Sequence, residues 1–450
     1  MSTPAQQSEA RALLEQLQND LRHRSLSEEQ LEDALAKLKV LGRDVGNVTA
    51  IYDEAGVGVL CAYAFGQYSS NIRLETLRCL ANALLLLPQT RRSSINLGLD
   101  KTATDALQHA STDEEFLLSR ILFLLTYDPQ IDLSALIDEH SLADSIVKLL
   151  QRHAEALSES CGHTSNPAFP ETLKLLFNVT NAKVEHISKF APATAQLSRI
   201  LKYTTIPSPP LQPPLSLIIN ALANLDFDSQ SLETNPKAPA ALTKLMTILE
   251  QAIQRYPTTE LDTIAIPLLT VLRNINNKAS PELRDQMKAR LLPNDEERDQ
   301  PLGKSSSLAS QLLRLTTSAG LLNLSEAISG LMFELSDKDA SQYVHNVGYG
   351  YAAGYLMTHK IPIPESARNG QYTGASSRQV PVNPVTGQRL DAEPVPDLPQ
   401  MTDEEKEREA ERLFVLFERL KATGVVDVKN PVEQARDEVR FEELSDSDSD

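Results

Sequence analysis

The stretch HNVGYGYAAGYL, residues 345–356, holds three glycines in a Gly-x-Gly-x-x-x-Gly pattern. Closely spaced glycines can bring backbone N–H groups against a nucleotide phosphate, but the dinucleotide-binding fingerprint requires a strand before them and a helix after them. The residues before this stretch predict a helix and its exit turn. We therefore expect no phosphate binding here. Gly348 and Gly350 are predicted to allow a tight turn between helices, and residues 352–354 to allow close packing.

The other motifs that could carry chemistry are incomplete. The stretch GKSSS, residues 303–307, resembles the end of a P-loop, but the first glycine of that motif would fall on Arg298. Cys161 and His163 are close in sequence, yet no second pair of ligands stands at zinc spacing. Neither a Gly-x-Ser-x-Gly elbow nor a His-Glu-x-x-His motif occurs. The sequence therefore predicts no catalytic residue, no metal site and no cofactor.

The composition favours an array of helices. The 450 residues include only 17 glycines and no tryptophan among abundant leucine and alanine, and the leucine-rich windows are too long and too poor in β-branched residues for strands. The formal net charge is −18, which opposes binding to nucleic acid or to an anionic bilayer.

Cysteine usage and hydropathy point to the cytoplasm. Three scattered cysteines are too few for a disulfide framework, and the N-terminal residues contain no apolar signal core. No apolar run approaches the ~18 residues needed to cross a bilayer. We expect a cytoplasmic protein that does not insert directly into membranes and that is a monomer when free.

A recurring helix core indicates a repeat protein. Four stretches contain the pattern Leu-x-Asn-apolar, and a fifth places threonine at the corresponding position, at intervals of 44 to 52 residues. Armadillo and HEAT units have similar lengths. The asparagines could line a concave groove and bind a peptide, or could cap and bridge within the array; both interpretations stay open. The marker positions are Asn82, Thr126, Asn178, Asn224 and Asn274.

The predicted architecture is an all-α armadillo/HEAT-type α-solenoid superhelix over residues 1–361. Residues 362–401 are rich in Pro, Gly and Ser and are predicted to be a flexible linker. In residues 402–424, a capping box and an apolar stripe predict an amphipathic helix that contacts a partner. Residues 425–450 are predicted to be an acidic, largely disordered tail. The stripe is formed by Leu413, Phe414, Leu416, Phe417 and Leu420.

Six stretches, in order along the chain from Leu77 to Val428, resemble one protein family. They are LRCLANALLLLP from Leu77, RILFLLT from Arg120, LKLLFNVT from Leu173, NVGYGYAAG from Asn346, VNPVTGQ from Val382 and MTDEEKEREAERLFVLFERL from Met401. The family is that of the synembryns, cytosolic exchange factors and folding chaperones for α subunits (Gα) of heterotrimeric G proteins. This resemblance implies that the solenoid grips the Gα C-terminal helix in its groove while the terminal helix reaches the Ras-like domain of Gα.

The resemblance also implies which residues line the groove. A C-terminal carboxylate favours guanidinium donors, so the chemistry predicts arginines beside this set. For Phe123 and Phe177, the alternative is a role in the core. The residues taken from the resemblance are Asn82, Arg120, Phe123, Phe177, Asn178 and Asn224. The arginines added are Arg73, Arg78 and Arg273.

One departure suggests a divergent, fungal branch. Animal members carry an acidic, phosphorylatable cluster before Asn-Pro-Val-Thr-Gly, whereas Ser376 and Ser377 have no acidic neighbours here. In the tail, Ser445 and Ser447 each have Asp at +1 and +3, so acid-directed phosphorylation is one interpretation and a solubilising tail the other.

The function implied is guanine nucleotide exchange without bond chemistry. The protein would bind GDP-bound Gα, promote GDP release and stabilise nucleotide-free Gα until GTP binds, with recruitment to the plasma membrane or cell cortex through Gα. The alternative is a generic helical-repeat adaptor that binds linear peptides without exchange activity. The sequence leaves open which Gα class is preferred.

Overall fold

The structure is a computed structural model that divides into two units, Met1–Ala392 and Glu393–Asp450. The residues it describes are 3–159, 166–227, 238–362, 382–383 and 386–393, with Thr402, Arg408 and Arg412. Within these residues, all regular elements are helices, apart from one isolated antiparallel bridge between Val382 and Arg389. The fold described below is that of the first unit.

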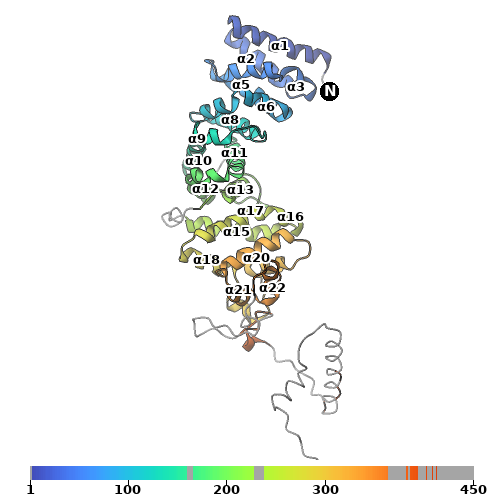
Figure 1. The fold of residues 1–450 in the computed structure, drawn as a ribbon, viewed down its shortest axis with the longest axis vertical. Coiled ribbons are helices and arrows are strands. Elements are labelled where there is room, and N and C mark those ends of the chain that lie inside the picture. The colour runs from blue at the N-terminus through green and yellow to red at the C-terminus, as the bar shows by residue number, and fades with distance from the viewer. Residues whose placement is uncertain are drawn as a thin grey trace, which may run out of the picture. The chain divides into compact units, whose positions relative to one another are not determined.

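The first unit is built from α-helices with three short 3₁₀ helices (Figure 1). The α-helices are α1 (Pro4–His23), α2 (Glu28–Leu41), α3 (Val45–Ile51), α4 (Glu54–Phe65), α5 (Ser70–Leu86), α6 (Gln89–Asn96), α7 (Leu99–Leu107), α8 (Thr112–Leu125), α9 (Leu133–Asp138), α10 (Leu142–Glu159), α11 (Ala168–Ala182), α12 (Ala191–Tyr203), α13 (Leu215–Ala223), α15 (Ala238–Arg255), α16 (Thr258–Ile264), α17 (Ile266–Lys278), α18 (Pro281–Leu291), α19 (Leu308–Thr316), α20 (Leu322–Leu335), α21 (Ala340–Val347) and α22 (Tyr349–Thr358). The 3₁₀ helices are η1 (Val184–Phe190), η2 (Glu296–Asp299) and η3 (Leu390–Ala392).

Local sequence fixes where many of these helices begin. At the start of α8, the Ser111 hydroxyl accepts the Glu114 N–H, and the Glu114 carboxylate accepts the Ser111 N–H at 3.0 Å. This capping box recurs at the starts of α1 and α2. Each box satisfies backbone donors that a helix N-terminus otherwise leaves unpaired.

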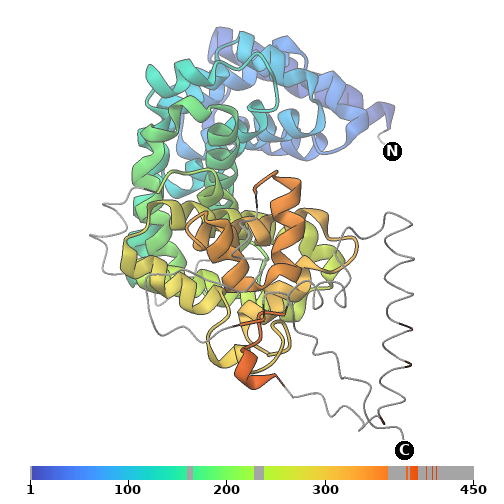
Figure 2. The same cartoon turned by 60° about the horizontal axis from the view of Figure 1, so that its bottom comes forward.

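The helices stack in two rows in which each member contacts the next. The first row, which we call the helix row, consists of α2, α5, α8, α11, α13, α17 and α20. The second row consists of α1, α4, α7, α10, α12 and α15. The helices follow one another in chain order (Figures 1 and 2). The prediction of an all-α armadillo/HEAT-type solenoid is confirmed.

The leucine of each Leu-x-Asn pattern lies in the core between the rows. Leu80, Leu176, Leu222 and Leu272 are all buried, and the buried side chains form one cluster that extends from Ala10 to Leu356. A continuous core of this kind is the defining feature of stacked repeats, because no single unit can bury its apolar face alone.

The glycine stretch is a turn between helices. Gly348 has a φ of 81° between α21 and α22, a left-handed conformation that favours glycine, and the preceding element is a helix. Ala352 is buried, as predicted. The prediction of close packing at Gly354 is wrong, because a Cβ atom there would meet nothing within 4 Å.

Part of the segment that we expected to be a linker belongs to the first unit. Residues 382–383 and 386–392 are hydrogen-bonded to the loop between α18 and α19, and the Val382 side chain is buried. The first unit accordingly extends to Ala392. No helix in the described parts of the chain is long and apolar enough to span a membrane.

Candidate functional site

The marker asparagines connect successive helices of the helix row. Asn178 Nδ2 donates to Thr126 Oγ1 at 2.8 Å, Asn224 Nδ2 donates to the Phe177 carbonyl at 3.2 Å, and Asn274 Nδ2 donates to the Ala223 carbonyl at 3.1 Å. Each asparagine therefore bonds to a group in the C-terminal part of the preceding helix of the row or, for Thr126, just after it. Of these acceptors, the Ala223 carbonyl belongs to the last turn of its helix, where carbonyl groups lack intrahelical partners.

The first marker follows the same rule. Asn82 Nδ2 donates to the Lys39 carbonyl on α2 at 3.5 Å. Thr126, the one marker that is not an asparagine, donates instead to the nearby Phe123 carbonyl at 2.6 Å. Of the two interpretations left open by the sequence, bridging within the array accounts for these amide donors. All four marker asparagines are partly buried and donate these bonds within the array.

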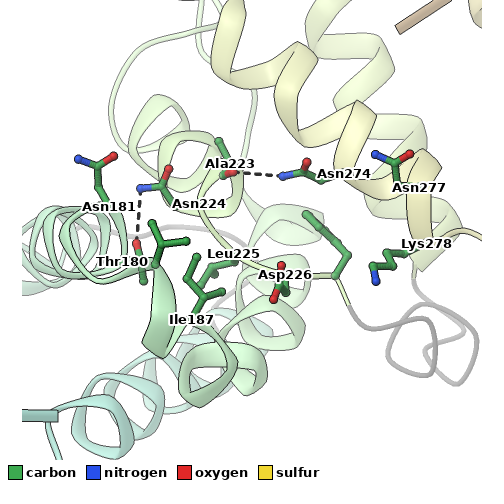
Figure 3. Close-up of a pocket in the computed structure, with 12 residues that line it drawn as sticks. Thr180, Asn181, Ile187, Ala223, Asn224, Leu225, Asp226, Asn274, Asn277 and Lys278 are labelled. Atoms are coloured by element: carbon green, nitrogen blue, oxygen red, sulfur yellow. Dashed lines mark hydrogen bonds between the residues drawn. The ribbon is translucent and has the colours of Figure 1, made fainter. Parts of the chain in front are cut away.

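A hollow of about 350 Å³ lies where the ends of α11, α13 and α17 meet (Figure 3). Its lining combines amide groups with one acidic and one basic side chain and a few apolar ones. The lining residues are Thr180, Asn181, Val184, Ile187, Ala223, Asn224, Leu225, Asp226, Phe227, Asn274, Asn277 and Lys278.

Two further asparagines give this hollow accessible amides. Asn181 and Asn277 lie three residues after the markers Asn178 and Asn274, and both are exposed. Residues spaced by three share a helix face, so the second asparagine of each pair continues the row of markers beyond the buried contact. An amide side chain offers both donors and an acceptor, which matches the alternating groups of a peptide backbone.

Ion pairs form a second set of connections along the helix row. Arg73 on α5 pairs with Glu114 on α8, Arg120 on α8 with Glu171 on α11 at 3.4 Å, and Arg273 on α17 with Glu334 on α20 at 2.6 Å. The arginine side chains are 32 to 39% exposed, whereas the glutamates are 7 to 12% exposed. The guanidinium groups thus remain reachable from solvent while their internal partners are covered.

The remaining predicted arginine belongs to a local cluster. Arg78 and Lys39 both pair with Glu75, at 2.5 and 2.6 Å. Burial opposes ionisation of Glu75, but the two cations hold the pKa of its carboxyl below the ordinary value. Arg273 behaves in the corresponding way, because the hydrogen bond to Glu334 raises the pKa of its guanidinium.

The two connection types complement each other. The α5 to α8 step, where no marker asparagine reaches back, has the Arg73 pair, and the α17 to α20 step has the Arg273 pair. The α11 to α13 and α13 to α17 steps use Asn224 and Asn274. Every pair of successive helices in the helix row therefore has at least one polar connection.

Two of the predicted arginines also line hollows. The hollow at Arg73 has a volume of about 330 Å³, and the hollow at Arg273 has a volume of about 750 Å³.

Phe123 and Phe177 are both half-buried, and Phe123 packs against the edge of the hydrophobic core. The Phe123 ring makes an edge contact with Tyr127 at a centroid distance of 5.3 Å, and Lys174 Nζ lies 5.9 Å from its centre. Both phenylalanines belong to the same helices as Arg120 and Asn178. Eight of the nine predicted groove residues lie in helices of the helix row, and Asn224 is the C-cap of α13.

The sequence analysis did not predict several residues that lie beside the predicted groove residues. The glutamates that pair with the arginines lie 41, 51 and 61 positions further along, so no constant repeat spacing reveals them. Asn181 and Asn277 had a usable signal, the spacing of three from a marker.

Two sets of predicted residues lie outside the described residues. They are the stripe of Leu413, Phe414, Leu416, Phe417 and Leu420, and the serines Ser445 and Ser447. Cys161 and His163 are also outside. Among the described residues, no group of three His, Cys, Asp or Glu side chains could hold a metal ion.

Comparison with known proteins identifies the family of this chain. An engineered protein of known structure aligns with 60% of this chain at 17% identity and a TM-score of 0.41, which is too slight to support an argument. A synembryn-like chaperone of Schizosaccharomyces pombe is 31% identical over 180 residues, which cover 38% of this chain and 34% of that protein. The chaperone Ric-8A of Gallus gallus is 25% identical over 449 residues, covering 87% of this chain and 81% of the relative. Residues 34–440 match the profile of the Ric8 family, described as guanine nucleotide exchange factor synembryn. The chain belongs to the synembryn (Ric8) family.

Proposed function

We propose that this protein is a guanine nucleotide exchange factor and folding chaperone for α subunits of heterotrimeric G proteins. The observation that carries the proposal is the family match over residues 34–440. The relatives named chaperones, which align with most of the chain, support the chaperone role. The activity needs no bond chemistry, because an exchange factor changes only the affinity of its partner for nucleotide.

The Gα C-terminal helix binds along the helix row in this proposal. Part-exposed guanidinium groups, from Arg73 to Arg273, suit carboxylates of the partner. The exposed amides of Asn181 and Asn277 suit the main chain of a terminal segment that leaves its helical conformation. Phe123 and Phe177 add half-buried apolar surface between these polar groups.

The internal glutamates shape how a partner carboxylate can bind. A guanidinium group has five N–H donors, and the Arg120 pair uses one nitrogen at 3.4 Å, so further donors remain for a second carboxylate. Binding then adds to the existing pair. It does not have to break the pair first, and Glu171 keeps a second partner in Lys174, whose Nζ lies 2.8 Å from the same carboxylate oxygen.

Exchange follows from linkage. If the protein binds nucleotide-free Gα more tightly than GDP-bound Gα, its binding must weaken GDP binding by the same factor. Holding the C-terminal helix of Gα disturbs the guanine-side loop attached to that helix, and GDP leaves. The same contacts then stabilise the empty Gα until GTP binds, which is the chaperone role. This partner also implies the cytoplasm, with membrane recruitment through Gα.

One assay tests the proposal against the adaptor alternative. Gα loaded with fluorescent GDP is mixed with the full chain, and release is followed in excess unlabelled GTP. The expected result is faster release, with no binding of labelled nucleotide by the chain alone. Binding of a Gα C-terminal peptide without any change in the release rate would favour the adaptor and contradict exchange activity.

The groove assignment has its own test. Arg120→Gln should weaken binding of Gα about tenfold, because one charge-assisted contact contributes about 1.4 kcal/mol. Arg92→Gln is the matched control: Arg92 pairs with Asp128 at 3.0 Å with similar exposure but lies on α6, outside the helix row. Isothermal titration calorimetry measures both. Equal affinities for wild type and Arg120→Gln would remove Arg120 from the site.

A further inference from the structure

Residues 382–383 and 386–392, which we call the anchored turn, are fastened to the loop between α18 and α19. The Arg389 N–H donates to the Arg298 carbonyl at 2.7 Å, and the Leu302 N–H donates to the Thr386 carbonyl at 3.0 Å. Within the turn, the Asn383 N–H donates to the Gln388 carbonyl at 2.7 Å. The two bonds between the turn and the loop join positions more than eighty residues apart, outside the repeat pattern of the helix row.

A buried arginine holds the centre of the turn. Arg298 is 5% exposed; its Nη1 donates to the Gly387 carbonyl at 3.1 Å, and its Nη2 donates to the Asn346 carbonyl at the same distance. The buried Gln388 side chain donates to the Asp299 carbonyl at 3.1 Å. These donors bond to backbone carbonyls and so hold the turn in one conformation. We call the part of the loop that contacts the turn, residues 298–302, the seat.

The fit leaves no room at the glycine of the turn. Gly387 has a φ of 68°, and a Cβ atom there would lie 2.4 Å from Cδ1 of the buried Leu302. Any other residue would be strained in backbone conformation and would also press on a covered side chain.

The loop that carries the seat is itself held in place. Glu297, the neighbour of Arg298, accepts hydroxyl bonds from Ser305, Ser307 and Ser310 at 2.6 to 2.8 Å, beside the N-terminus of α19. Burial opposes ionisation of Glu297, but these hydroxyls hold the pKa of its carboxyl below the ordinary value. The loop therefore has hydrogen bonds of its own in which the turn takes no part.

We infer that the anchored turn is a positioning element, which fixes the point from which the C-terminal segment starts and so raises its effective concentration at bound Gα. The inference rests on the proposed function and adds to it the second contact with Gα, by residues 402–424, that the family resemblance implies. With the turn in its seat, the link to Thr402 starts at Ala392; without it, the link starts at Ile361. The link is then about 40 residues long instead of about 10, and the effective concentration falls roughly eightfold by the −3/2 power of length.

The test uses the full chain and a matched glycine. Gly387→Ala, alone and with Gln388→Ala, should release the turn. Gly320→Ala is the control, because Gly320 also has a positive φ, of 85°, but nothing lies within 4 Å of a Cβ atom there. Hydrogen exchange at the Leu302 and Arg389 amides reports release without any partner. Faster exchange is expected in the Gly387 variants and unchanged exchange in the control.

Affinity for Gα then separates positioning from simple structural support. The Gly387 variants should bind Gα roughly eightfold more weakly, from the same length dependence. Deleting residues 364–379 in the variant background should restore part of the affinity by shortening the link. In a chain with Phe414→Asp and Phe417→Asp, which removes the second contact, Gly387→Ala should have no further effect.

The outcomes distinguish the inference from the function on which it rests. A wild-type chain that neither binds Gα nor accelerates GDP release contradicts the proposed function. Faster amide exchange with unchanged Gα affinity overturns the positioning inference alone. Should the Gly387 variants keep slow exchange, Arg298→Met removes the guanidinium donors; slow exchange in that variant too would show that these contacts do not hold the turn, and would overturn the inference.

Discussion

The helix row and the anchored turn are both connected by hydrogen bonds between distant residues, but they differ in redundancy. Along the row, asparagine bonds and ion pairs recur between neighbouring helices, and two of the steps have both kinds. The anchored turn depends on one arginine and one short loop. Repeat proteins distribute their stability over nearest-neighbour contacts. Single substitutions should therefore be absorbed along the row, and should release the turn.

The largest exception to redundancy is expected at Glu115. This fully buried carboxylate contacts His153 at 2.7 Å, Arg152 at 2.5 Å and Thr172 at 2.8 Å, so it joins α8, α10 and α11 at one point. Glu115→Ala should lower the free energy of unfolding by about 3 kcal/mol, because the remaining buried groups lose their partner. Urea unfolding measures this, with the exposed Glu139→Ala as the control. A decrease in the free energy of unfolding below 1 kcal/mol would show that the contacts of Glu115 are also redundant.

A smaller effect should appear as pH dependence near the anchored turn. Burial, with the charge of Arg298 adding to it, lowers the pKa of His345 from 6.5 to about 4. Between these values the unfolded chain holds a proton that the folded chain does not, so this group makes stability fall as the pH falls from 6.5 to 4.

The variant His345→Gln should flatten that slope. The change should stay below about 1.4 kcal/mol per pH unit, the limit for one proton. Chemical unfolding at several pH values measures it. Identical slopes in wild type and variant would contradict the assignment.

Removing a single hydrogen bond between neighbouring helices of the row should lower the free energy of unfolding less than Glu115→Ala does. Asn178→Ala should lower the free energy of unfolding by about 1 kcal/mol, because it removes one partly buried hydrogen bond to Thr126. Asn181→Ala, one helical turn further on at an exposed position, should change stability by less than about 0.5 kcal/mol. Thermal unfolding compares the two. Equal losses would mean that Asn181 is also structural, and would weaken the proposal that its amide binds a partner.

The repeats could be predicted because their signal is local and periodic. Leucine at a fixed offset from a polar marker predicts a buried face beside a helix end, and Leu80, Leu176, Leu222 and Leu272 are buried as expected. The role of the asparagines could not be decided from sequence, because a bound peptide and a neighbouring helix end present the same carbonyl groups. The structure decides the question, because it shows that the preceding helix lies close enough to accept the asparagine hydrogen bonds.

The ion pairs and the anchored turn could not be predicted for a different reason. Loop lengths vary between units, so Arg73 and Arg120 reach their glutamates over different sequence distances. The turn lies in a segment with few apolar residues, which composition assigns to a linker. Its attachment depends on Arg298, a residue that the sequence presented only as the failure of a P-loop match.

The covered glutamates beneath the row arginines imply a particular response to ionic strength. An intramolecular carboxylate in low-dielectric surroundings is screened weakly by added salt, whereas a carboxylate arriving from another molecule is screened strongly. Raising the salt concentration should therefore detach an acidic partner segment long before it loosens the solenoid. If the proposed binding mode holds, Gα affinity should fall with added salt much more steeply than the stability of the array does.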